Sequence, residues 1–137
     1  MRVVVDTTVL VSVFSDKDKF HKDGIRLYSD ILDRKIEPII PTLAFPETCG
    51  VIRRILGEHI AIMVEDQLNL LVDNEVLKAE ELTIKRMKSS VESAIRYSVR
   101  GGDAVFISLT EEFDAKLATF DEELKKKIKG RVKLFKI

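Results

Sequence analysis

The feature that most restricts the fold of this chain is a run of three valines close to its first residue. Val3, Val4 and Val5 stand together and are followed directly by Asp6. A strand with one face in water alternates apolar and polar residues, so an unbroken apolar run predicts a strand covered on both faces. Such strands are typical of parallel sheets that lie between two layers of helices. We therefore expect a short buried strand over residues 3–6 of an α/β protein.

The rest of the chain alternates between helical periodicity and short apolar runs. Further strands are expected over residues 36–40, 116–119 and 131–135, with a poorly marked one over 70–72. Helices are expected over residues 20–34, 42–56, 58–71, 76–99 and 103–113, and in the Lys-rich segment before residue 131. The helix over 76–99 is either continuous or divided near Ser89 and Ser90, whereas Gly57 and the pair Gly101 and Gly102 mark breaks. The prediction is one domain over residues 1–137, a helix-rich three-layer α/β/α fold with a small central parallel sheet.

The charge of the chain is balanced overall but unevenly distributed. There are 23 Lys and Arg residues against 23 Asp and Glu residues, which gives no general basic signal for nucleic acid. Residues 125–136, however, contain no acid and many bases: Lys125, Lys126, Lys127, Lys129, Arg131, Lys133 and Lys136. Such a run is usually a solvated face, although beside an acidic site it would suit a phosphate backbone.

A single cysteine, Cys49, excludes an internal disulfide and is typical of a reducing compartment, so we expect a cytoplasmic protein. Neither His21 nor His59 stands in a recognisable catalytic motif with it, which favours a small apolar core residue over a nucleophile. The residues before Asp6 are too few for a signal peptide. No segment approaches the ~20 apolar residues of a membrane span, so no membrane partner is expected.

Four acidic residues stand where a strand or loop gives way to a helix: Asp6, Glu47, Asp103 and Asp121. In an open parallel sheet, the carboxyl ends of the strands and the adjacent helix starts meet along one edge, where ligands bind. Each acid has a purely structural explanation, because Asp is a favoured N-cap and Glu is favoured in a first helical turn. Capping does not explain why four such acids should gather at one edge, where they repel one another unless a cation joins them.

The donor set predicts the kind of cation. Mg²⁺ and Mn²⁺ prefer oxygen ligands and often keep several waters, which a pocket of carboxylates allows. The lack of a Cys/His cluster argues against zinc, and the lack of glycine-rich phosphate loops argues against the common nucleotide sites. A divalent metal held by carboxylates in a chain without a nucleotide motif indicates hydrolysis of a phosphodiester.

Four segments of the chain resemble the PIN-domain family. They are Asp-Thr-Thr-Val-Leu at residues 6–10, Glu47 early in a helix, Asp-Ala at 103–104 opening an apolar helix, and Leu-Ala-Thr-Phe-Asp at 117–121. Their order and approximate spacing, together with the chain length, resemble the small single-domain members, among them the VapC-like toxins of toxin–antitoxin pairs. The resemblance covers the whole chain.

The resemblance implies a Mg²⁺- or Mn²⁺-dependent ribonuclease, the toxin of a type II toxin–antitoxin pair. The acids implied to be catalytic and metal-binding are Asp6, Glu47, Asp103 and Asp121. The hydroxyls of Thr8 and Thr119 would support them, and Glu123 would be an outer ligand. The implied partners are an RNA substrate, a small antitoxin and a second copy of the chain, with the helix over 58–71 as one surface for association. Arg53, Arg54, Arg96 and Arg100 are either phosphate contacts or ordinary surface residues.

Two alternatives stay open from the sequence. Pro46 precedes Glu47 inside the expected helix and removes a backbone N–H group, so it could tilt Glu47 away and leave a catalytically silent RNA- or protein-binding module. The second alternative is a phosphoryl-transfer domain with Asp6 as the acceptor. Phosphatases of that shape carry a second Asp two residues later, where this chain has Thr8.

Overall fold

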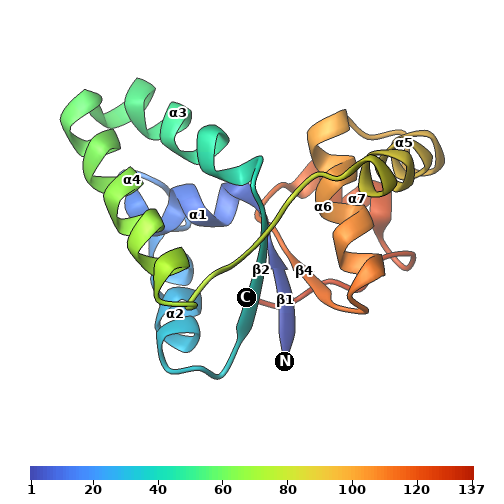
Figure 1. Ribbon diagram of the computed structural model, residues 1–137, viewed down its shortest axis with the longest axis horizontal. Coiled ribbons are helices and arrows are strands. Elements are labelled where there is room, and N and C mark those ends of the chain that lie inside the picture. The colour runs from blue at the N-terminus through green and yellow to red at the C-terminus, as the bar shows by residue number, and fades with distance from the viewer.

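A four-stranded, all-parallel sheet lies at the centre of the computed structural model, which describes residues 1–137 (Figure 1). Its strands are β1 (Arg2–Val5), β2 (Glu37–Pro41), β3 (Lys78–Glu80) and β4 (Lys116–Ala118), in the order β3-β2-β1-β4. Val4 pairs with Ile39 of β2 on one side and with Leu117 of β4 on the other. The predicted helix-rich α/β fold with a small parallel sheet is confirmed.

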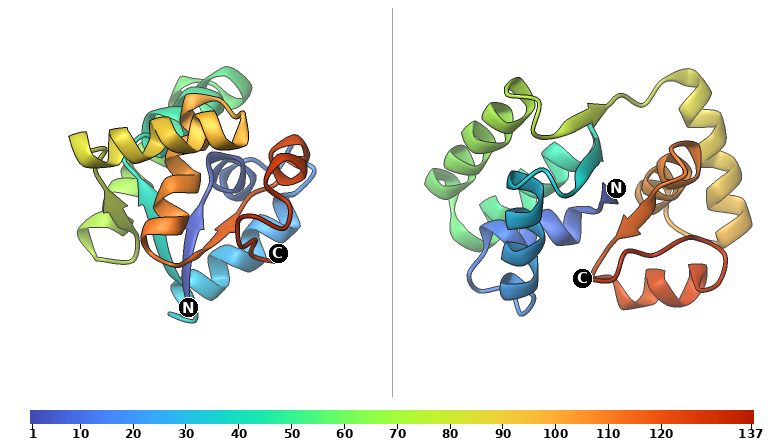
Figure 2. Two further views of the ribbon diagram at one scale, coloured as in Figure 1. Left: turned by 90° about the vertical axis from the view of Figure 1, so that its right-hand side faces the viewer. Right: turned by 90° about the horizontal axis from the view of Figure 1, so that it is seen from below.

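The helices form two groups on opposite faces of this sheet (Figures 1 and 2). One group is α1 (Thr7–Phe14), α2 (His21–Leu32), α3 (Ala44–Leu56) and α4 (Glu58–Asp73). The other is α5 (Ile84–Tyr97), α6 (Gly101–Glu112) and α7 (Glu122–Ile128). The sheet grows from β1 toward β3 and then continues on the other side of β1 with β4. Because parallel crossovers are right-handed, this reversal of direction places the later helices on the opposite face.

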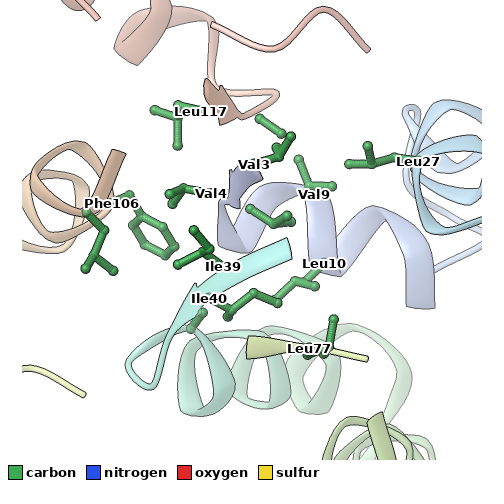
Figure 3. Packing of buried hydrophobic residues seen from close by; sticks show 14 of the residues in the cluster. Val3, Val4, Val9, Leu10, Leu27, Ile39, Ile40, Leu77, Phe106 and Leu117 are labelled. Carbon is green, nitrogen blue, oxygen red and sulfur yellow. The ribbon is translucent and has the colours of Figure 1, made fainter. Parts of the chain in front are cut away.

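The valine run is the centre of the core, as the sequence predicts. Val3, Val4 and Val5 are all 0 % exposed. Figure 3 shows the strand between Phe106 of α6 on one side and Leu27 of α2 on the other. Full burial of one such side chain stabilises the fold by roughly 1.5–3 kcal/mol, and only a strand covered on both faces buries consecutive residues.

The reversal of strand order also fixes where a ligand site belongs. All four strands are parallel, so their carboxyl ends lie at one edge, here called the carboxyl edge; the opposite one is the amino edge. The connections that follow β1 and β4 lead to helices on opposite faces (Figure 1), and at such a reversal a ligand site between the strand ends is expected. Asp6 directly follows β1, and Thr119 directly follows β4. No helix of the chain is both long enough and apolar enough to span a bilayer.

Two predicted elements between β2 and α6 are wrong. The strand expected over 70–72 is part of α4, whose buried residues Leu68 and Leu71 continue its apolar face. The real third strand, β3, lies inside the segment expected to be helical over 76–99. It has three residues, pairs only with β2 and is half-exposed, so it carries no apolar run that sequence could detect. The later part of that segment is the continuous helix α5, in which Ser90 donates to the Arg86 carbonyl at 2.8 Å.

Two further boundaries differ in the C-terminal third. The break before α6 is at Ser98, whose φ of 55° is left-handed, and Gly101 and Gly102 form the first turn of α6. The strand expected over 131–135 is reduced to one bridge, between Leu117 and Leu134.

Candidate active site

Asp6 is the buried centre of the carboxyl edge. Its residue is 5 % exposed, and its backbone N–H donates to the Ala118 carbonyl of β4 at 3.0 Å. Thr119 Oγ1 and Thr8 Oγ1 donate to the same carboxylate oxygen, Oδ2, at 2.7 Å and 2.8 Å. The pKa of Asp6 is raised above its ordinary value, chiefly by burial and to a smaller extent by the charge of Glu47. The hydrogen bonds from the two hydroxyls act in the opposite direction and lower this pKa. The raised pKa shows that burial outweighs these hydrogen bonds.

The two hydroxyls that hold Asp6 are themselves held by the loop after β4. Phe120 N–H donates to Thr8 Oγ1 at 3.0 Å, and Asp121 N–H donates to Thr119 Oγ1 at 3.1 Å. Each hydroxyl has one proton, and the backbone donors direct that proton toward Asp6. The result is a fixed carboxylate at the junction of β1 and β4.

Glu47 reaches this edge from α3. Its carboxylate oxygen Oε1 accepts a hydrogen bond from Thr7 Oγ1 at 2.9 Å. Its other oxygen lies 3.5 Å from where a Cβ atom would stand on Gly102 in α6, so Glu47 extends toward the first turn of that helix. Pro46 does not prevent this, because it is the third residue of α3, where a backbone N–H has no partner within the helix. As expected, Glu47 is a first-turn residue.

Asp103 comes from the opposite face of the sheet. It lies in the first turn of α6 and is not the N-cap, a position occupied by Arg100, so the capping explanation for Asp103 is wrong. Its side chain is 23 % exposed. Partial burial raises its pKa, and the charges of Asp6 and Asp121 raise it further, while Arg100 and Lys127 lower it. Asp103 is therefore close enough to both other aspartates for their charges to interact.

Asp121 is the one acid that caps a helix with its side chain. Its Oδ1 accepts from Leu124 N–H at 3.1 Å at the start of α7. Asp6 occupies the N-cap position of α1 but makes no capping bond. Capping thus accounts for one oxygen of Asp121 and leaves Asp6, Glu47 and Asp103 unexplained.

A pocket of about 280 Å³ opens beside Asp103 and Asp121. Its other lining residues are Val99, Arg100, Glu123, Leu124 and Lys127. Glu123, which the sequence suggests as an outer ligand, is among these lining residues. Of the four arginines proposed from the sequence, only Arg100 lines this pocket.

The model of the PIN domain matches the sequence over residues 3–129. This chain belongs to the PIN-domain family. The match extends from β1 to the end of α7 and includes all four candidate acids. No curated protein is matched by the sequence.

Solved structures of other proteins share this PIN fold at low sequence identity. VapC20 of Mycobacterium tuberculosis, a sarcin–ricin loop cleaving toxin, superimposes with a TM-score of 0.73 at 15% identity, over 90% of this chain and 93% of its own. A toxin–antitoxin complex from Klebsiella pneumoniae gives 0.70 at 13% identity, over 98% and 96%. VapBC2 of Rickettsia felis, bound to a DNA fragment from its promoter, gives 0.68 at 13% identity, over 98% of each chain.

The donors of this PIN domain suit a divalent cation in their chemistry. All are carboxylate or hydroxyl oxygens, the ligands that Mg²⁺ and Mn²⁺ prefer. No group of three acidic, histidine or cysteine side chains converges closely enough to hold a metal ion together. Burial, and after it the charges of Asp6 and Asp121, raise the pKa of Asp103, so these carboxylates lie within reach of one another's charge without converging on one point.

The other reactive side chains take no part in this site. Cys49 is half-buried against the core, and burial, followed by the charge of Glu65, raises its thiol pKa, so it stays a protonated thiol. His21 Nδ1 lies 2.7 Å from the Ser12 carbonyl, and His59 is exposed on α4.

Sequence reasoning missed two residues of the PIN site. Thr7, which donates to Glu47, is not predicted by the four acidic motifs, although a hydroxyl beside a candidate metal ligand is a usable signal. Lys127 is, in the sequence, only one member of a basic run. Its place in the pocket depends on how α7 packs, which no local pattern reveals.

Proposed function

We propose that this PIN domain is a divalent-metal-dependent endoribonuclease and the toxin of a type II toxin–antitoxin pair, acting in the cytoplasm. The observation that carries the proposal is the buried Asp6. Two hydroxyls hold its carboxylate, and it lies close enough to Glu47 and Asp103 for their charges to interact. Membership of the PIN family and the likeness to a toxin described as cleaving the sarcin–ricin loop support the reaction type.

In this proposal Asp6, Glu47, Asp103 and Asp121 hold Mg²⁺ or Mn²⁺. The cation, when bound, supplies an activated water and neutralises charge on the phosphate that is attacked. Thr8 and Thr119 keep Asp6 in place, and the hydrogen bond from Thr7 holds Glu47 at the carboxyl edge. No side-chain general base is needed, and the expected products carry a 5′-phosphate and a 3′-hydroxyl.

One contact argues against each of the two alternatives. The silent binding module depended on Pro46 displacing Glu47, whereas Glu47 is held by Thr7 at the carboxyl edge. A phosphoryl acceptor must be reached by its substrate, whereas Asp6 is 5 % exposed and has one oxygen occupied by two hydroxyl donors.

Metal binding is the first test. We expect Mn²⁺ titrated into metal-stripped protein to show saturable binding by calorimetry and electron paramagnetic resonance. Asp6→Asn should lose it, because Asp6 is the acid whose charge is most costly without a cation. Absence of binding at millimolar Mn²⁺ in a folded protein would refute the metal site.

Cleavage of RNA is the second test, and it should use a mixed pool because the target sequence is unknown. We expect cleavage with Mg²⁺ or Mn²⁺ and none with EDTA, with 5′-phosphate ends identified by ligation. If the protein bound the metal but cleaved no member of the pool, the proposed metal site would stand and the proposed ribonuclease activity would be refuted.

The proposed partners are RNA, a small antitoxin and a second copy of the chain. The surface that best suits the second copy is a stripe on α5 formed by Ile84, Met87, Val91 and Ile95, which are 71%, 40%, 50% and 78% exposed. Lys88 and Glu92 on the same helix are exposed and form no ion pair within the chain.

Antiparallel packing of two α5 helices fits this stripe. It would bring Ile84 of one copy near Ile95 of the other, and Lys88 near Glu92, because both pairs are centred on the middle of the helix. Light scattering after size exclusion should show a dimer that Ile95→Lys converts to monomer. The same change at exposed Leu70 on α4, the helix first expected to associate, is the control. Dissociation by Leu70→Lys alone would move the interface to α4.

A further inference from the structure

The pocket beside Asp103 and Asp121 has cations as well as carboxylates in its wall. Arg100 and Lys127 line it together with both aspartates. A chain of phosphates approaching four carboxylates is repelled by them, and one bound divalent cation offsets only part of that repulsion. Cations fixed at the rim would offset the rest where the backbone enters.

Lys127 is positioned at this rim by the chain itself. Its Nζ donates to the Ser98 carbonyl at 2.8 Å, at the left-handed turn that ends α5. No carboxylate lies within ion-pair distance of Lys127, so its charge is not neutralised by a partner. Arg100 is 88 % exposed, and its one ion-pair contact, to Asp103, is long at 3.8 Å. Both cations are thus available to an anion in the pocket.

Three of the other basic residues of this region have partners away from the pocket. Lys125 pairs with Glu122, and Lys133 pairs with Asp114. Arg131 lies 4.4 Å from the Tyr97 ring and donates to the Arg96 carbonyl. Lys126 is exposed on α7, one residue before Lys127, but lines no part of the pocket. The basic run therefore contributes only Lys127 to the pocket, and Lys126 beside it can serve as a control.

We propose that Arg100 and Lys127 form a subsite for a backbone phosphate of the RNA, next to the phosphate that is cleaved and on the Asp103 and Asp121 side of the site. This inference rests on the proposed ribonuclease function and deepens it. The substrate then enters between the first turn of α6 and α7, and the two residues bind and position the RNA without touching the reacting bond.

The test measures binding apart from cleavage. Asp6→Asn protein, which should not cleave, is titrated into a fluorescently labelled single-stranded RNA at several KCl concentrations, and anisotropy is recorded. A single lost phosphate contact lowers the slope of log affinity against log salt by about 0.7, which is roughly a five- to tenfold loss of affinity near 50 mM salt. We expect this loss from added Lys127→Ala or Arg100→Ala, and about twice the slope change from both.

Two controls separate the subsite from general charge and from misfolding. Lys126→Ala removes the same charge from the same helix and should leave the slope unchanged. Lys127→Arg keeps the charge and should restore most of the affinity. With Asp6 intact, Lys127→Ala should raise KM for RNA much more than it lowers kcat.

The outcomes distinguish this inference from the function on which it rests. Equal effects of Lys127→Ala and Lys126→Ala, in a protein that cleaves RNA, would overturn the subsite and leave the ribonuclease. Failure of the wild-type protein to cleave RNA, with no RNA binding by Asp6→Asn, would overturn both.

Discussion

The two edges of the sheet differ in how far their charged side chains are exposed to water. At the carboxyl edge, the 5 % exposed Asp6 accepts two hydrogen bonds from hydroxyls, and Asp103 and Asp121 line a pocket of about 280 Å³. At the amino edge, a larger pocket of about 590 Å³ is lined by Ile36, Pro38 and Leu77, with Arg34, Glu37, Glu75 and Lys78 among its other residues. Those four charged residues are exposed and of mixed sign, and Arg34 donates to the Glu75 carbonyl at 2.9 Å.

The comparison shows that the larger pocket is not the one beside the proposed site. At the amino edge, water solvates the charges and none of them needs a ligand. At the carboxyl edge, like charges lie close enough to interact and one of them is buried, an arrangement that a bound cation would make more favourable. Function is therefore expected where the fold tolerates an electrostatic cost, and each prediction below changes one side of this comparison.

The largest effect is expected on catalysis. Asp103→Asn should lower the metal-dependent cleavage rate on the order of 10²–10³-fold, because it removes a preorganised charge from the site. Glu37→Gln, the matched change at the amino edge, should leave the rate unchanged. Rates are measured with one RNA at saturating Mn²⁺, and circular dichroism verifies the fold. Loss of activity in Glu37→Gln, or its retention in Asp103→Asn, would remove the distinction between the edges.

The residues of the carboxyl edge could be predicted because their signals are local. An apolar run followed by Asp6 defines both a buried strand and the acid at its end, and Thr119 and Asp121 stand at the equivalent place after β4. β3 could not be predicted, since an edge strand of three half-exposed residues is specified by its pairing with β2. The stripe of α5 illustrates another limit, because Ile84 and Ile95 have the spacing of core residues although they are exposed.

The next effect is on stability. Asp6→Asn should make metal-stripped protein more stable by about 1 kcal/mol, which raises Tm by roughly 2–6 °C, because a buried charge is removed while an acceptor oxygen remains for a hydroxyl. Glu37→Gln, at an exposed position, should change stability little. Thermal denaturation in EDTA measures both. With Mn²⁺ added, the order of wild type and Asp6→Asn should reverse, since only the wild type gains stability from binding.

A dependence on pH should follow from the same charges. Burial raises the pKa of Asp6 and of Asp103 above the ordinary 3.8, so the folded protein binds more protons than the unfolded chain in the interval above that value. The free energy of unfolding should then fall as the pH rises through the interval, and level off once both groups are ionised in the folded state. Urea denaturation of the metal-stripped protein measures this against the Asp6→Asn/Asp103→Asn double variant. A difference between the two proteins that did not change with pH would contradict the assignment.

The last comparison is between two buried threonines, and it includes the smallest expected effect, that of Thr48→Val. Thr119 is 1 % exposed, donates to Asp6 and accepts from Asp121 N–H, whereas Thr48 in α3 is 0 % exposed and its Oγ1 has no partner. Replacing a hydroxyl that has hydrogen-bond partners leaves those buried partners without a bond. Replacing a buried hydroxyl that has no partner removes the cost of its desolvation. Thr48→Val should therefore stabilise the protein by about 0.5–1 kcal/mol, and Thr119→Val should destabilise it by about 1–2 kcal/mol, as judged by denaturant midpoints at constant m-value.

This pair of threonines tests whether the hydrogen-bond network, and not burial itself, distinguishes the carboxyl edge. Both changes remove one hydroxyl from a buried β-branched side chain, so packing and helix propensity change little at Thr48. Thr119→Val should also weaken Mn²⁺ binding, because Asp6 loses one of the two donors that orient it. Thr48→Val should leave the metal affinity unchanged even though Glu47 is its direct neighbour. If both changes destabilised the fold equally, the hydroxyl of Thr48 would have a partner, and the network around Asp6 would not be special.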